Sequence, residues 1–260
     1  MVVALESLGV MATEQNFDVA GPADAHAIVF VHGMRVTRRM WQPQIESLTS
    51  EFRVIAVDLP GHGSFRNETF HVEHAVEELA AVVDQAANGR ALVVGLSLGG
   101  YIAMDFGARY PQKAAGLVIA SASVEPRGWY NVPYRILSEL MAKLPEPWLN
   151  WVSRTFFLLV YGRRRAEPLI APGFFMRGGA AGIREVMNRE FAPKLAAYPG
   201  PVLLLNGARD LGFRMHERRF LAATQNGRLE VIPKAFHLAN IDQPEAFSEA
   251  VRRFARSISW

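Results

Sequence analysis

The sequence contains no cysteine, which excludes disulfide bonds and cysteine metal ligands. No run of residues is long and apolar enough for a membrane-spanning helix, so we expect no stable membrane association. Neither sign of charge dominates, because 28 basic and 25 acidic residues give a net charge of +3. That balance does not favour nucleic acid as a partner. The first residues lack the basic segment of a secretory signal, so a cytoplasmic location is expected.

Short apolar runs alternate with segments of helical periodicity along most of the chain. Continuous apolar runs are typical of strands that are buried on both faces, and six are expected at 27–31, 53–57, 91–94, 116–120, 201–205 and 229–232. Segments such as 72–87 and 100–110 space their apolar residues at helical intervals. One or two edge strands are expected around 2–7 and 10–19. The pattern predicts an α/β fold with a mostly parallel, doubly wound sheet of about eight strands.

One long segment interrupts this alternation and is rich in aromatic residues and proline. We interpret residues 124–194 as a helical cap, inserted after the sixth strand of a core domain that comprises 1–123 and 195–260. The insertion leaves the sheet at the carboxyl end of a strand, where α/β sheets place their ligand crevices. Its aromatic side chains are therefore candidates for the wall of a substrate pocket: Trp129, Trp148, Trp151 and Phe156.

The most specific motif is Gly-Leu-Ser-Leu-Gly-Gly, residues 95–100, between a predicted strand and a predicted helix. In this context Gly-x-Ser-x-Gly marks a nucleophilic serine, because a sharp strand-to-helix turn presents the hydroxyl at the end of the sheet. The flanking glycines allow neighbouring backbone to approach closely. A serine that only caps a helix is the alternative. The context favours Ser97 as a nucleophile.

A serine hydroxyl is a weak nucleophile and needs a base, which a carboxylate orients. His237 follows the last predicted strand, and Asp210 follows the strand before it. The order Ser97, Asp210, His237 is the chain order expected for an α/β-hydrolase triad. Glu125 is the rival carboxylate, and Asp210 is preferred because Gly-x-x-Asp comes directly at a strand end.

Negative charge that develops on a carbonyl oxygen must be met by preorganised N–H donors. One donor is expected from Leu98, directly after the nucleophile, and the other from Met34, in the loop after the strand at 27–31. Leu238, next to the candidate base, is a further candidate for the pocket wall.

Taken together, these motifs make the chain resemble the α/β-hydrolase superfamily. The resemblance is carried by His32-Gly33, Trp41, Asp58-Leu59-Pro60-Gly61-His62-Gly63-Ser64, Gly95 to Gly100, Gly207 to Asp210 and Phe236-His237. Within the superfamily the chain is similar to small cytoplasmic carboxylesterases, enol-lactonases and cofactor-free haloperoxidases. The resemblance implies that no metal or organic cofactor is required, and that the Asp58 to Ser64 segment is a structural turn beside the site.

Departures from related families narrow the choice. Serine at position 97 argues against the haloalkane dehalogenases and epoxide hydrolases that resemble this fold, which use aspartate there. The His-Gly-Gly-Gly loop of many lipases is absent, since Met34 and Arg35 follow Gly33. Arg35, Arg38 and Arg39 are unusual additions to this loop. They could bind a substrate carboxylate bidentately, although such arginines are more often solvated surface residues.

The sequence thus predicts a serine hydrolase that acts through an acyl-enzyme on esters or lactones of modest, largely apolar acids. Two alternatives remain open. One is hydrolysis or elimination at a carbon–carbon bond by the same triad, and the other is a small-molecule receptor that keeps the fold but turns over slowly. Neither the substrate nor the oligomeric state follows from the sequence.

Overall fold

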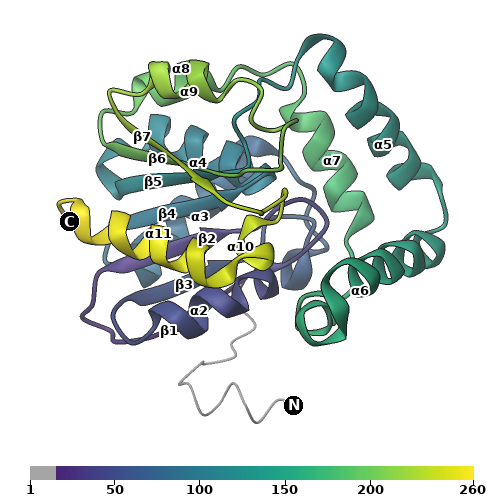
Figure 1. Ribbon diagram of the computed structural model, residues 1–260, viewed down its shortest axis with the longest axis horizontal. Helices are drawn as coiled ribbons and strands as arrows, with labels where there is room; N and C mark the ends of the chain where they lie inside the picture. The colour runs from purple at the N-terminus through teal and green to yellow at the C-terminus, as the bar shows by residue number, and fades with distance from the viewer. Residues whose placement is uncertain (1–15) are drawn as a thin grey trace.

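A seven-stranded sheet forms the centre of the computed structural model, which describes residues 16–260 (Figure 1). The strands lie in the order β1-β3-β2-β4-β5-β6-β7, and each neighbouring pair is parallel except the antiparallel edge pair β1 and β3. Their bounds are β1 Phe17–Ala20, β2 Ala27–Val31, β3 Arg53–Val57, β4 Ala91–Leu96, β5 Ala114–Ala120, β6 Pro201–Gly207 and β7 Asn226–Ile232.

The central strands are apolar throughout because both faces of the sheet are covered. Val29 and Val31 pack into the core on one face, whereas Ile28 and Phe30 pack into the core on the other. The first face is covered by α3 Val72–Ala86, α4 Leu98–Arg109, α8 Ala192–Ala197 and α9 Glu217–Ala223. The second face is covered by α2 Gln42–Leu48, α10 Ala239–Asp242 and α11 Pro244–Ser257. The prediction of a doubly wound, mostly parallel sheet is therefore confirmed.

All six expected runs are strands of this sheet, and a seventh, β1, pairs at one edge. The expectation of burial is wrong for β7, which forms the other edge and is buried only at Ile232. The expected edge strand at 2–7 lies outside the described residues, and the one at 10–19 lies partly outside them. Among the described strands the insertion follows the fifth, β5. The expectation that it follows a sixth strand included the strand at 2–7, which lies outside the described residues.

The chain between β5 and β6 is helical and contains η4 Gly128–Tyr130, α5 Asn131–Lys143, α6 Glu146–Ile170, α7 Met176–Val186 and α8. We call η4 and α5 to α7 the insertion. Helices α5, α6 and α7 lie together beyond one end of the strands, at the right of Figure 1. Helix α6 changes direction at Gly162, whose φ is 70°. The expected domain boundary at residue 194 falls inside α8, which packs against α4 of the core.

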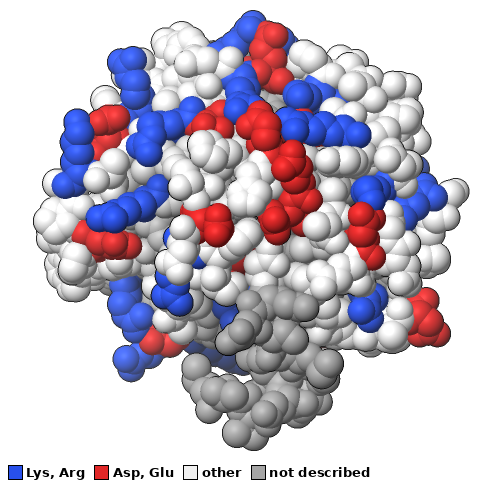
Figure 2. All heavy atoms as spheres, turned by 180° about the vertical axis from the view of Figure 1, so that it is seen from behind, with Lys and Arg blue, Asp and Glu red and all other residues white. Residues whose placement is uncertain are grey.

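Charged side chains of both signs are mixed on the face shown in Figure 2, and neither sign covers that face alone. Ion pairs occur between described residues of opposite charge, such as Glu73 with Arg189 and Asp105 with Lys194. Within residues 16–260, no helix combines the length and apolarity needed to span a bilayer. Short 3₁₀ helices complete the described chain: η1 Arg38–Trp41, η2 Gly63–Phe65 and η3 Pro111–Lys113.

Candidate active site

Ser97 occupies a strained turn between β4 and α4. Its φ of 55° and ψ of −116° lie where side-chain-bearing residues are rarely found, and its side chain is almost fully buried. The turn is possible because glycines flank it. A Cβ on Gly95 would lie 2.1 Å from the carbonyl oxygen of Gly99, and a Cβ on Gly99 would lie 2.2 Å from that of Val31. The local sequence therefore fits the turn that the motif predicts.

Replacing Gly99 with alanine should destabilise the fold, because the new methyl group would meet backbone oxygens that cannot move aside. We expect the free energy of unfolding to fall by about 3 kcal/mol. The matched control is Gly212→Ala, since a Cβ at Gly212 meets nothing within 4 Å. That variant should stay within about 0.5 kcal/mol of the original chain. Urea unfolding of the three proteins measures the difference, and equal losses in both variants would contradict this steric account.

Asp210 and His237 come from adjacent loops and are hydrogen bonded to each other. Nδ1 of His237 lies 2.9 Å from Oδ2 of Asp210. The backbone holds the two loops together, because the N–H of Arg209 donates to the carbonyl of Ala235 at 2.8 Å. Gly207 permits this approach, since a Cβ there would lie 2.2 Å from the carbonyl oxygen of Phe236. The carboxylate fixes a proton on Nδ1 and leaves Nε2 of His237 as a proton acceptor.

The two expected oxyanion donors lie beside Ser97. Leu98 is the first residue of α4, where backbone N–H groups have no partner within the helix. Met34 is in the loop after β2 and lines both cavities at Ser97. A Cβ on Gly33 would lie 3.6 Å from Cβ of Ser97, so this loop passes directly over the serine.

Two buried histidines join the Met34 loop to the Asp58 to Ser64 turn, His32 from the loop and His62 from the turn. The N–H of Arg35 donates to Nε2 of His62 at 3.0 Å, and Nδ1 of His62 is 2.9 Å from the carbonyl oxygen of Pro60. In the same way, the N–H of Leu59 donates to Nε2 of His32 at 3.0 Å. Burial lowers the pKa of His32, and it lowers that of His62 to about 3. Both imidazoles are therefore neutral supports of the loop, in line with a structural role for the Asp58 to Ser64 turn.

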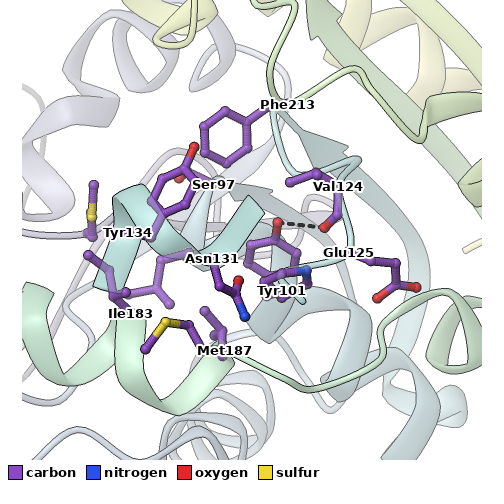
Figure 3. Close-up of a pocket in the computed structure, with 13 residues that line it drawn as sticks. Ser97, Tyr101, Val124, Glu125, Asn131, Tyr134, Ile183, Met187 and Phe213 are labelled. Atoms are coloured by element: carbon purple, nitrogen blue, oxygen red, sulfur yellow. Dashed lines mark hydrogen bonds between the residues drawn. The ribbon is translucent and has the colours of Figure 1, made fainter. Parts of the chain in front are cut away.

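Two cavities share Ser97 and Met34 in their walls. The smaller one, about 60 Å³, extends toward α7 and the start of α5. Figure 3 shows it with Ser97 at one end and Asn131 and Met187 at the other. The larger one, about 420 Å³, also contains His237 and is bounded by α6. Ser97 is thus reached from two sides, one narrow and one wide.

The structure brings some of the expected pocket residues to Ser97 and not others. Arg35, Phe156 and Leu238 line the larger cavity. Trp129 and Trp148 line neither cavity, and their side chains are 71% and 52% exposed. Trp151 lines a separate groove between the insertion and the segment 66–70, away from the serine.

Three aromatic residues line the site or contact the candidate base, although no sequence motif predicts them there. Phe213 packs against the candidate base, with its ring centroid 4.1 Å from that of His237. Tyr134 of α5 lies edge-on to Phe213 and lines the smaller cavity, and burial raises its pKa. Tyr161 of α6 lines the larger cavity. All three depend on where loops and the insertion pack, which local patterns do not encode.

The expectation that the three arginines of the Met34 loop are solvated surface residues is wrong for two of them. Arg38 is only 12% exposed and forms ion pairs with Asp18 at 2.9 Å and Asp58 at 2.8 Å. Arg35 reaches beneath α6 and lines the larger cavity. Arg39 is half-buried beside β1. The sequence could not reveal these contacts because they come from β1, from Asp58 directly after β3, and from α6.

Glu125, the rival carboxylate, lines the smaller cavity, but its oxygens are bound to backbone and not to the candidate base. Its two oxygens accept hydrogen bonds from the N–H groups of Phe191 and Ala192, both at 3.0 Å, at the start of α8. Its carboxylate points away from Ser97 in Figure 3. Within residues 16–260, no group of three or more histidine or acidic side chains is placed to hold a metal ion.

Comparison with known proteins agrees with this architecture. A family model described as "Alpha/beta hydrolase family" matches residues 28–250. The pimeloyl-[acyl-carrier protein] methyl ester esterase of Pectobacterium carotovorum is 30% identical over 247 residues, which cover 88% of this chain and 94% of that protein. The 3-oxoadipate enol-lactonase 1 of Acinetobacter baylyi is 27% identical over 249 residues, which cover 94% of this chain and 93% of that protein.

The chain is also similar in structure to a solved protein. The structure of a thermophilic esterase from Thermogutta terrifontis, with malate bound, superposes with a TM-score of 0.77 at 25% identity. The superposition covers 92% of each chain.

Proposed function

The chain belongs to the alpha/beta hydrolase family, and from that premise we propose that it is a serine hydrolase that cleaves a carboxylic ester or lactone. The relatives named as an esterase and an enol-lactonase support this class of bond. The single observation that carries the proposal is the 2.9 Å contact between Asp210 and His237, because His237 in turn lines the same cavity as Ser97.

In the proposed mechanism, Nε2 of His237 accepts the proton of the Ser97 hydroxyl as Oγ attacks the carbonyl carbon of the substrate. The N–H groups of Leu98 and Met34 stabilise the oxyanion. His237 then gives its proton to the leaving alkoxide oxygen, and an acyl-enzyme remains on Ser97. Water that is deprotonated by His237 attacks this ester, and the acid leaves as Ser97 regains its proton.

The two cavities indicate how a substrate would lie. The wide cavity, with walls of Val36, Leu96, Phe156, Val160 and similar side chains, fits the volume of ordinary ligand pockets. The narrow cavity accommodates a short group. We propose that helices α5 to α7 act as a lid, since α6 supplies one wall of the wide cavity and α7 supplies one wall of the narrow cavity.

A fluorophosphonate probe tests the nucleophile directly. We expect stoichiometric labelling of the folded protein, with the adduct on the peptide that contains Ser97, because an activated serine attacks phosphorus as it attacks an acyl carbon. Mass spectrometry of the digested protein locates the adduct, and protein unfolded in urea serves as the control. Absence of the adduct from folded protein would refute the mechanism.

A substrate panel then separates the candidate activities. We expect hydrolysis of p-nitrophenyl esters and small lactones of graded chain length, with the shortest acyl groups preferred if they occupy the narrow cavity. Turnover of vinylogous diketones without turnover of esters would instead indicate hydrolysis of carbon–carbon bonds. A labelled serine without turnover of any compound would indicate a receptor.

A further inference from the structure

Arg35 is held rigidly at the mouth of the candidate oxyanion hole. It directly follows Met34, and its φ is 58°, a conformation that residues with side chains rarely adopt. Its backbone N–H donates a hydrogen bond to Nε2 of the buried His62 at 3.0 Å. Its stem packs against α7, where a Cβ on Gly179 would lie 3.1 Å from Cβ of Arg35. The side chain therefore leaves the loop in one fixed direction, beneath α6.

The guanidinium group of Arg35 has neutral neighbours. Nη1 donates to Oγ of Ser153 in α6 at 3.2 Å, and Cζ lies 5.8 Å from the centre of the Phe174 ring. Among the described residues no carboxylate forms an ion pair with it. Arg38, in the same loop, differs sharply, since Asp18 and Asp58 both pair with it. Of these two arginines, only Arg35 lines the larger cavity.

A guanidinium group in such surroundings is poised to bind an anion. Burial lowers the pKa of Arg35, yet an arginine side chain keeps its charge in proteins. A buried charge is unfavourable unless an opposite charge and hydrogen bonds compensate it. The single bond to Ser153 leaves further N–H donors of the planar group for a carboxylate, which arginine binds through two parallel hydrogen bonds.

The wall of the larger cavity contains two residues of opposite charge, Arg35 and Asp242. Arg35 lies with Ser97 and His237 in a wall that is otherwise mostly apolar. Asp242 is the second charged residue of that wall, and it accepts a hydrogen bond from the N–H of Phe236 at 2.7 Å. Burial raises the pKa of Asp242, and the positive charges of Arg165 and Arg209 oppose that shift. A substrate anion would therefore be attracted to the Arg35 side of the cavity and repelled from the Asp242 side.

We propose that Arg35 determines specificity by binding a free carboxylate of the substrate, so that the preferred substrate is an ester or lactone that carries one negative charge beside the scissile carbonyl group. This inference rests on the proposed serine hydrolase function. It adds a charged group to a substrate that is otherwise apolar. It also gives a role to Arg35, with which no carboxylate of residues 16–260 forms an ion pair.

A matched pair of esters tests the charge requirement. Monoethyl glutarate carries a carboxylate, and ethyl 5-oxohexanoate replaces it with a methyl ketone of nearly the same shape. We expect kcat/KM of the unmodified protein to be higher for the charged ester by about 100-fold, the factor that corresponds to a charge-assisted bidentate contact. No preference, or a preference for the ketone, would overturn the proposal without any variant.

Substitutions assign that preference to Arg35. In Arg35→Met the ratio of the two kcat/KM values should fall by about 100-fold, and in Arg35→Lys it should fall less, because the charge remains without the planar fork. Ser153→Ala, which removes the bond to α6 but keeps the guanidinium group, should retain the preference. Glutarate should inhibit the unmodified protein competitively and lose this effect in Arg35→Met.

The alternative is that Arg35 only ties the Met34 loop to α6. Equal losses for both esters in Arg35→Met, with an unchanged ratio, would show this and overturn the proposal. Labelling of Ser97 by a fluorophosphonate is independent of the charge of the substrate. A labelled serine without a preference for the charged ester would thus contradict the role of Arg35 alone, whereas an unlabelled serine would contradict the proposed function itself.

Discussion

Replacement of Ser97 by alanine is expected to lower kcat/KM for every ester substrate by about 10⁴- to 10⁶-fold, the range seen when a triad nucleophile is removed. The loss is large because alanine has no hydroxyl group with which to form the acyl-enzyme. The fold should be retained, since serine and alanine meet the same steric demands at a φ of 55°. Initial rates with an activated ester, together with urea unfolding, measure activity and stability separately.

Ser121 offers a matched control for this experiment. It directly follows the neighbouring strand β5, is fully buried and also has a positive φ, of 48°. Its hydroxyl oxygen has no hydrogen-bond partner among the described residues, and it lines neither cavity at Ser97. Ser121→Ala should therefore keep its activity. If Ser97→Ala retained more than about one hundredth of the activity, the nucleophile would have to be sought elsewhere.

Replacement of Asp210 by asparagine is expected to lower kcat by about 10⁴-fold, because an amide cannot hold His237 in the required tautomer or stabilise its imidazolium form. The side-chain volume is unchanged, so packing around the 2.9 Å contact should persist. The loss should therefore appear in kcat rather than in stability. Stopped-flow or steady-state rates with an activated ester, at several pH values, measure it.

Glu125→Gln distinguishes the two candidate carboxylates. The oxygens of Glu125 accept from the N–H groups of Phe191 and Ala192, so an amide can satisfy only one of these donors. We expect a loss of about 1–3 kcal/mol in the free energy of unfolding, with kcat reduced by less than about tenfold. A large loss of kcat in Glu125→Gln, with none in Asp210→Asn, would reverse the assignment.

The sheet and the position of the site followed from local chemistry that the sequence displays. Apolar runs predicted the strands β2 to β6 because strands buried on both faces are mainly apolar. The edge strand β7 was found from a shorter run, and only its Ile232 is buried. The turn at Ser97 was predictable because only glycines tolerate the backbone contacts beside it. Asp210 and His237 were predicted from the rule that parallel strands bring their carboxyl ends to one edge of the sheet.

The walls of the cavities were not predictable in the same way. Trp129, Trp148 and Trp151 were expected over the serine because they are aromatic and lie in the insertion, yet all three are more than half exposed. Phe156, on the same helix as Trp148 and Trp151, does line the cavity. The rotation of α6 about its axis and its position beyond the sheet decide which side chains reach Ser97, and helical periodicity alone fixes neither.

By itself the sequence determined which backbone could form the serine turn, which strands build the sheet and which loops meet at its edge. These features depend on steric and hydrophobic rules that act over a few neighbouring residues. Only the tertiary structure decided that Arg38 is paired by Asp18 and Asp58, while Arg35 lines a cavity and its guanidinium group contacts the uncharged Ser153 and Phe174. The reason is physical: the environment of a charge is set by atoms close in space, and around Arg35 these come from α6 and α7, distant in the sequence.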